Sequence, residues 1–105
     1  MVIGDREIKI IQGDSYRREI TIENISNELI EGVYFTCGDL DICRKLDFYD
    51  GVYILSFTPQ ETEEIGKFNG NYDITIKFVG NVVNTIQFRS PINIIPKNNK
   101  VTCYG

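Results

Sequence analysis

The stretch from Phe57 to Phe78 constrains the fold most, because a helix-start signal is followed directly by a strand pattern. Thr58 can accept a hydrogen bond from the backbone N–H of Glu61, whose carboxylate can bond back to Thr58, and Pro59 stands at the first helical position. A glycine typical of helix ends, Gly66, limits the predicted helix to residues 59–66. The following apolar residues alternate with polar ones, as in a half-buried strand: Tyr72, Ile74, Ile76 and Phe78.

The same two-residue alternation recurs along the chain between turn signals. Asp50–Gly51 and Gly80–Asn81 are dipeptides typical of tight hairpins, and Ser90–Pro91 is expected to break a strand. Strands are predicted over residues 6–12, 15–23, 33–37, 42–48, 52–57, 72–78, 82–88 and 92–95. The expected fold class is all-β, an antiparallel immunoglobulin-like β-sandwich of about seven or eight strands with one short helical turn at residues 59–66. We expect one domain over residues 1–95 and a polar tail over residues 96–105.

Position within each predicted strand assigns side chains to the core or to solvent. Ile86 and Phe88 are expected to face the core, and Cys37 is expected to be a small core residue. Arg18 falls on the apolar face of its strand. It is therefore expected near a sheet edge, with its stem packed and its head group in water.

The residue composition offers little catalytic chemistry. The chain has no histidine, the commonest general base and metal ligand. Its cysteines, Cys37, Cys43 and Cys103, are too few for a four-cysteine zinc site and are expected to be reduced. We therefore expect no enzymatic activity, no catalytic residues and no cofactor.

Charge and hydropathy narrow the classes of partner. The net charge is −4, and the basic clusters, Arg17–Arg18 and Arg44–Lys45, are only pairs, each beside acidic residues, which argues against nucleic-acid binding. No apolar run approaches the roughly 18 residues of a membrane span, and the N-terminal residues do not form a secretion signal. We expect no membrane partner.

The acid-rich segment over residues 38–51 is the one place to ask about a cation. Its four aspartates, Asp39, Asp41, Asp47 and Asp50, offer oxygen ligands of the kind that calcium prefers. They lack the fixed spacing of a calcium loop, and carboxylates are common in solvated turns. No metal ligand is assigned, and calcium stays an open alternative.

Three tyrosines are the candidate contact residues for a protein partner. Tyr34, Tyr49 and Tyr104 fall on or near the solvent-facing positions of the pattern. Tyrosine contributes large contact area at low entropic cost, so it suits protein or sugar contacts. The competing interpretation is that single exposed aromatic residues are ordinary on protein surfaces.

Several short motifs resemble those of an immunoglobulin-like domain found in structural proteins of tailed phages and prophages. The opening Ile10-Ile11-Gln12-Gly13-Asp14, the segment Val33-Tyr34-Phe35-Thr36, the turn Thr58-Pro59-Gln60-Glu61-Thr62 and the strand start Gly70-Asn71-Tyr72-Asp73-Ile74 are similar to that domain. The residues that carry the likeness are structural, namely Gly13, Asp14, Thr58, Pro59, Glu61, Thr62, Gly70, Tyr72 and Asp73. We expect the Asp73 carboxylate to cap backbone N–H groups rather than to bind a ligand.

The resemblance implies a role in the virion. Members of the group resemble the N-terminal domain of upper-baseplate and tail-fibre proteins. We therefore expect a non-enzymatic virion structural or accessory protein in the tail, baseplate or head, made in the cytoplasm of a bacterial host. Its partners would be other virion proteins, and itself in a homo-oligomer. The alternatives are a small phage-encoded inhibitor of a host defence protein and, less favoured without tryptophan, a carbohydrate-binding module.

Overall fold

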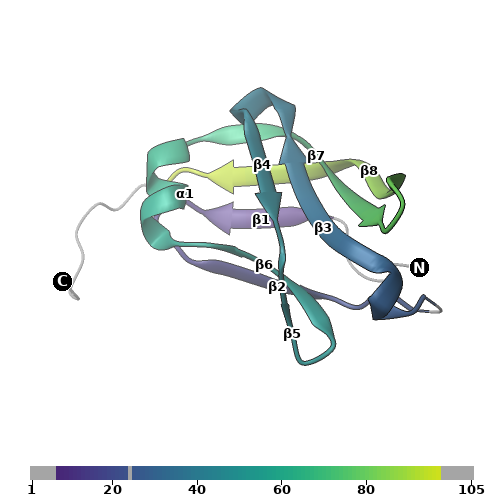
Figure 1. Ribbon diagram of the computed structural model, residues 1–105. Helices are drawn as coiled ribbons and strands as arrows, with labels where there is room; N and C mark the ends of the chain where they lie inside the picture. The colour runs from purple at the N-terminus through teal and green to yellow at the C-terminus, as the bar shows by residue number, and fades with distance from the viewer. Residues whose placement is uncertain (1–6, 24, 98–105) are drawn as a thin grey trace.

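A computed structural model describes residues 7–23 and 25–97 of the chain, and these residues form two β-sheets with one short α-helix (Figure 1). The larger sheet has five strands in the order β1-β8-β7-β3-β4: β1 (Ile8–Ile11), β8 (Val82–Ile95), β7 (Phe68–Phe78), β3 (Ile30–Cys37) and β4 (Ile42–Lys45). The smaller sheet has three strands in the order β2-β6-β5: β2 (Tyr16–Ile20), β6 (Val52–Phe57) and β5 (Asp47–Tyr49). The predicted all-β class is confirmed.

The helix α1 (Pro59–Ile65) and the turns agree with the local signals in the sequence. Both hydrogen bonds of the Thr58–Glu61 capping box form, since each side chain accepts from the backbone N–H of the other residue, and Pro59 lies in the first turn. Asp50 and Gly51 have φ angles of 50° and 83°, and the β5–β6 hairpin turns there. Two 3₁₀ turns also form, Asn27–Leu29 before β3 and Gly38–Leu40 after it. No helix in the described part of the chain is long and apolar enough to cross a bilayer.

A single core lies between the two sheets. Phe35 on β3 contacts Phe57 on β6 edge to face, with ring centroids 5.5 Å apart, and stacks on Tyr72 of β7 at 5.3 Å. The buried side chains alternate along their strands as predicted, and they include Ile8, Ile10, Val33, Phe35, Cys37, Tyr53, Leu55, Phe57, Tyr72, Ile74 and Ile76.

The prediction that all strands pair antiparallel is wrong for β1. β1 runs parallel to β8, with Ile8 opposite Ile92 and Ile11 opposite Ile95. Parallel neighbours need a long connection, and here most of the chain lies between the two strands. Local sequence patterns do not specify such a pairing.

The predicted single strand over residues 42–48 is wrong, because the chain changes sheets there. β4 pairs with β3 in the larger sheet, whereas β5 pairs with β6 in the smaller one. Leu46 lies between β4 and β5 and is buried, and its N–H donates to the carbonyl oxygen of Val33. This crossing joins the two sheets at one side of the core.

The predicted inward position of Phe88 is also wrong. Its side chain is 66% exposed, whereas the neighbouring Gln87 is buried, and Ile86 packs partly against the core as expected. The β7–β8 register shifts twice: Tyr72 faces Ser90, Ile74 faces Gln87, and Thr75 faces Thr85. Each shift inserts an extra residue in β8, and such a β-bulge changes which side chains face inward.

Two further expectations for single residues change. The break at Ser90–Pro91 is absent, because β8 continues through Pro91, where β7 is its only described neighbouring strand; β1 pairs only from Ile92 onward. Arg18 does lie on an edge strand, β2, but its head group is not left to water. It donates to the hydroxyl of Tyr72 at 2.8 Å.

Candidate functional site

The motif residues at the start of the chain and in α1 are joined by hydrogen bonds. The Thr62 hydroxyl, fully buried on α1, accepts from the N–H of Gly13 at 3.0 Å and donates to the carbonyl oxygen of Asp14 at 2.8 Å. Gly13 has a φ angle of 87°, which favours glycine there. The segment that begins the fold is therefore held against the helix that lies 48 residues later in the chain.

The same helix is tied to both sheets through Arg44 on β4. Its guanidinium pairs with Glu61, donates to the carbonyl oxygen of Ser56, and lies 4.7 Å from the ring centroid of Phe57. The hydrogen bond from Arg44, followed by that from the Thr58 N–H, lowers the pKa of the Glu61 carboxyl against the opposing effect of burial. Glu61 thus serves both the helix cap and the contact between the sheets.

The motif residues of β7 have structural roles as well. The buried hydroxyl of Tyr72 accepts from Arg18 and donates to the Gln87 side-chain oxygen at 3.0 Å. The Asp73 carboxylate accepts from the N–H of Arg89 at 2.8 Å, which is the capping role that we expected. A Cβ at Gly70 would lie 2.6 Å from the ring of Phe68, so that ring would have to shift if any other residue stood at position 70.

The aspartates of the acid-rich segment do not gather into one site. Asp39 and Asp41 lie at the 3₁₀ turn between β3 and β4, whereas Asp47 begins β5 and Asp50 lies in the β5–β6 turn. Within residues 7–23 and 25–97, no group of three or more acidic or cysteine side chains could hold a metal ion. Cys37 is buried as predicted, and burial raises the pKa of its thiol; Cys43 is exposed, and Cys103 lies outside the described residues.

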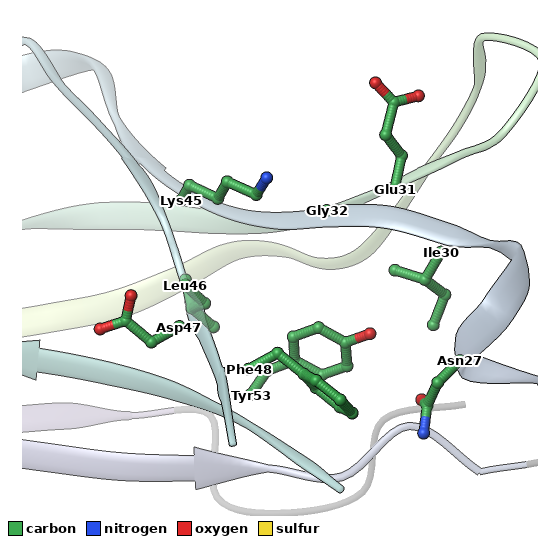
Figure 2. A pocket seen from close by; sticks show the side chains of 9 residues that line it. All are labelled: Asn27, Ile30, Glu31, Gly32, Lys45, Leu46, Asp47, Phe48 and Tyr53. Carbon is green, nitrogen blue, oxygen red and sulfur yellow. The ribbon is translucent and has the colours of Figure 1, made fainter. Parts of the chain in front are cut away.

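An open cleft of about 450 Å³ lies where the chain crosses from β4 to β5 (Figure 2). Its lining comes from the start of β3, the crossing segment and β6, and consists of Asn27, Ile30, Glu31, Gly32, Lys45, Leu46, Asp47, Phe48 and Tyr53. Figure 2 shows the apolar side chains between β3 and the smaller sheet, whereas Glu31 and Lys45 point away on the other side of β3. The cleft therefore has an apolar interior and a charged rim.

Aromatic rings form the wall of the cleft that belongs to the smaller sheet. Phe48 and Tyr53 face each other across β5 and β6, with ring centroids 4.8 Å apart. Tyr53 is buried, which raises the pKa of its hydroxyl, but Phe48 is 51% exposed. Tyr49, the next residue, is 70% exposed at the hairpin tip.

The predicted contact tyrosines do not form one cluster. Tyr49 does not line the cleft, because it follows Phe48 on β5 and successive side chains of a strand point to opposite faces. Tyr34 is half-buried on the other side of β3, where its ring lies over Gly32 and faces Lys45 on β4. Tyr104 lies outside the described residues. Sequence reasoning missed the cleft and the exposure of Phe48, since both depend on the change of sheet at Leu46.

The arrangement can hold an apolar side chain. Leu46, Phe48 and Tyr53 supply apolar and aromatic surface, beside the polar side chains of Asn27 and Asp47. Comparisons with protein-family models, with curated proteins and with solved structures found no match for this chain.

Proposed function

We propose that this chain is a non-enzymatic structural or accessory protein of a tailed-phage or prophage virion, and that it acts through protein–protein contact in the tail, baseplate or head. In this proposal its two sheets are an immunoglobulin-like β-sandwich. The observation that carries the contact function is the cleft at the β4–β5 crossing, with Phe48 and Tyr49 exposed beside it. Exposed aromatic residues next to an apolar cavity are typical anchors of protein interfaces.

The hydrogen bonds between the motif residues support the virion part of the proposal. The motifs that resemble the phage domain are far apart in the sequence, yet Thr62 bonds to Gly13 and Asp14. Short motifs that resemble a family by chance have no reason to contact one another. Their contact is what a shared fold requires.

The geometry of the cleft indicates how a partner would bind. An apolar side chain of the partner would enter between Leu46 and Phe48. Lys45 and Asp47 on the rim offer one charge of each sign, which favours a partner with a mixed polar surface. Burial of the exposed Phe48 ring would then supply much of the affinity.

The test is whether the chain is a component of particles. Particles from the strain that encodes the chain are banded by density after prophage induction, and the chain is quantified with an antibody. We expect it to band with the particles at a constant ratio to the major virion protein. Recovery only in the unbanded lysate, bound to one host protein, would refute the proposal and favour a defence inhibitor.

Variants locate the contact once the chain is found in particles. Tagged chain with Phe48→Ala is expressed in the same strain, and we expect its incorporation to fall at least about tenfold, the result of losing roughly 1.4 kcal/mol or more of contact energy. Ile11→Ala is the matched control, because it also removes an exposed apolar side chain but lies on β1. If the Phe48→Ala chain and the Ile11→Ala chain are incorporated equally, binding through the cleft is contradicted.

A further inference from the structure

Among the residues that the structure describes, β8 has one edge without a strand partner along most of its length. β8 spans 14 residues and pairs with β7 on one side, whereas β1 covers its other side only from Ile92 to Ile95. Figure 1 shows the β7–β8 hairpin extending beyond the start of β1. Among the described residues, no strand pairs with the outer side of β8 from Val82 to Pro91. Every second residue of such an edge has backbone groups without a strand partner.

The first part of this edge, Val82–Thr85, lacks the features that usually prevent edge-to-edge pairing, whereas the register shifts, Arg89 and Pro91 all come later in β8. Charged residues make up 25% of the chain, yet none occurs between Lys77 and Arg89. Val82 and Val83 are 58% and 60% exposed, and both are β-branched residues that favour strands. Natural edge strands are commonly protected by charges, prolines or early bulges. An uncharged, apolar edge is therefore expected to be covered by another strand.

The usable length of the edge is set by the β-bulges in β8. The pairing with β7 is regular from Val82 to Thr85, and the first register shift follows it. The second ends in Arg89, whose φ angle of 52° and hydrogen bond to Asp73 hold the backbone out of a straight strand. The regular segment Val82–Thr85 is thus the part that a further strand can pair with.

We propose that this segment pairs antiparallel with the same segment of a second copy of the chain, about a two-fold axis. In such a pair Val82 lies opposite Thr85 of the second copy and Val83 opposite its Asn84, so any charge in the segment would occur twice within one short interface. The absence of charge fits self-pairing, and the valine and threonine side chains would form β-branched cross-strand pairs. The two five-stranded sheets become one continuous sheet. This inference deepens the proposed function, because it names one partner and its surface.

The test measures the mass of the purified full chain in solution and asks how its dimerisation depends on charges in the paired segment. Sedimentation equilibrium over a concentration series is expected to show a monomer–dimer equilibrium. A double variant with Val82→Glu and Thr85→Glu, and another with Val82→Lys and Thr85→Lys, should each raise the dissociation constant about tenfold or more, the effect of roughly 1.4 kcal/mol of repulsion between like charges that lie opposite each other. An equal mixture of the two variants should dimerise again, because opposite charges then meet. Thr21→Lys is the matched control, since Thr21 is exposed and lies outside β8, and it should leave the dimer unchanged.

Hydrogen exchange supplies a readout of the backbone pairing itself. Amide exchange in Val82–Thr85 should slow as the wild-type chain dimerises, whereas that in β5 should not. A wild-type chain that stays monomeric, a dimer unaffected by both charged variants, or variants that fail to dimerise when mixed would each overturn the inference. None of these results bears on whether the chain bands with particles, so the two proposals fail separately.

Discussion

The buried hydroxyl of Tyr72 offers the sharpest test of the core. Tyr72 is 1% exposed, and its hydroxyl lies between the Arg18 guanidinium at 2.8 Å and the Gln87 side-chain oxygen at 3.0 Å. Tyr72→Phe removes the hydroxyl and keeps the ring that stacks on Phe35. The substitution therefore isolates the polar contacts from the packing.

The expected loss follows from what the missing hydroxyl leaves behind. Gln87 is 2% exposed, so its side-chain oxygen would lose a donor in a place with little access to water. An unsatisfied buried polar group costs about 1–3 kcal/mol, and we expect Tyr72→Phe to destabilise the fold by that amount. Tyr72→Ala removes the ring as well and should cost roughly 3–5 kcal/mol.

Urea unfolding followed by far-ultraviolet circular dichroism measures these losses, since a changed tyrosine does not disturb that signal. Gln87→Met removes the acceptor instead of the donor, and the double variant removes both. Because the double variant leaves neither group unpaired, its cost should be smaller than the sum of the two single costs by about 0.5–3 kcal/mol.

Two results would refute this account of the core. A loss below about 0.5 kcal/mol for Tyr72→Phe is typical of a surface substitution and would mean that the hydroxyl is hydrated. A loss below about 1 kcal/mol for Tyr72→Ala would show that the ring itself is not in the core.

Further predictions concern the contacts of helix α1. The lowered pKa of Glu61 means that its stabilising effect is complete above its unfolded-state pKa near 4.5 and is lost as the pH falls through the folded-state value. Glu61→Gln keeps a capping side chain but not the charge, so the urea midpoint should fall less steeply below about pH 5 than in the wild type; identical pH profiles would contradict the Arg44 contact. Thr62→Val keeps the side-chain shape but removes the hydroxyl that bonds to Gly13 and Asp14, so unfolding free energy should fall by about 1–3 kcal/mol. A Thr62→Ser variant, which retains the hydroxyl, should recover the part of that loss due to the hydrogen bonds.

The features that the sequence determined by itself are those with short-range causes. The cap of α1 needs only Thr58, Pro59 and Glu61, which are neighbours in the chain. The turn at Asp50–Gly51 needs two residues that tolerate positive φ angles. The alternation from Tyr72 to Ile76 reports which face of one strand is apolar, and those side chains are buried.

Only the tertiary structure decided how these elements combine, and with them the candidate site. The cleft exists because the chain changes sheets at Leu46, and the change depends on β3 and β6 as separate partners. Phe88 is exposed because it lies within the second register shift with β7, between the buried Gln87 and Ser90, and a one-residue shift reverses the faces of a strand. β1 pairs in parallel with β8 only from Ile92 to Ile95, so most of the β8 edge has no strand partner among the described residues. This pairing also joins residues that are far apart in the chain. Each of these outcomes depends on pairings between distant segments, whose energies are absent from any local pattern.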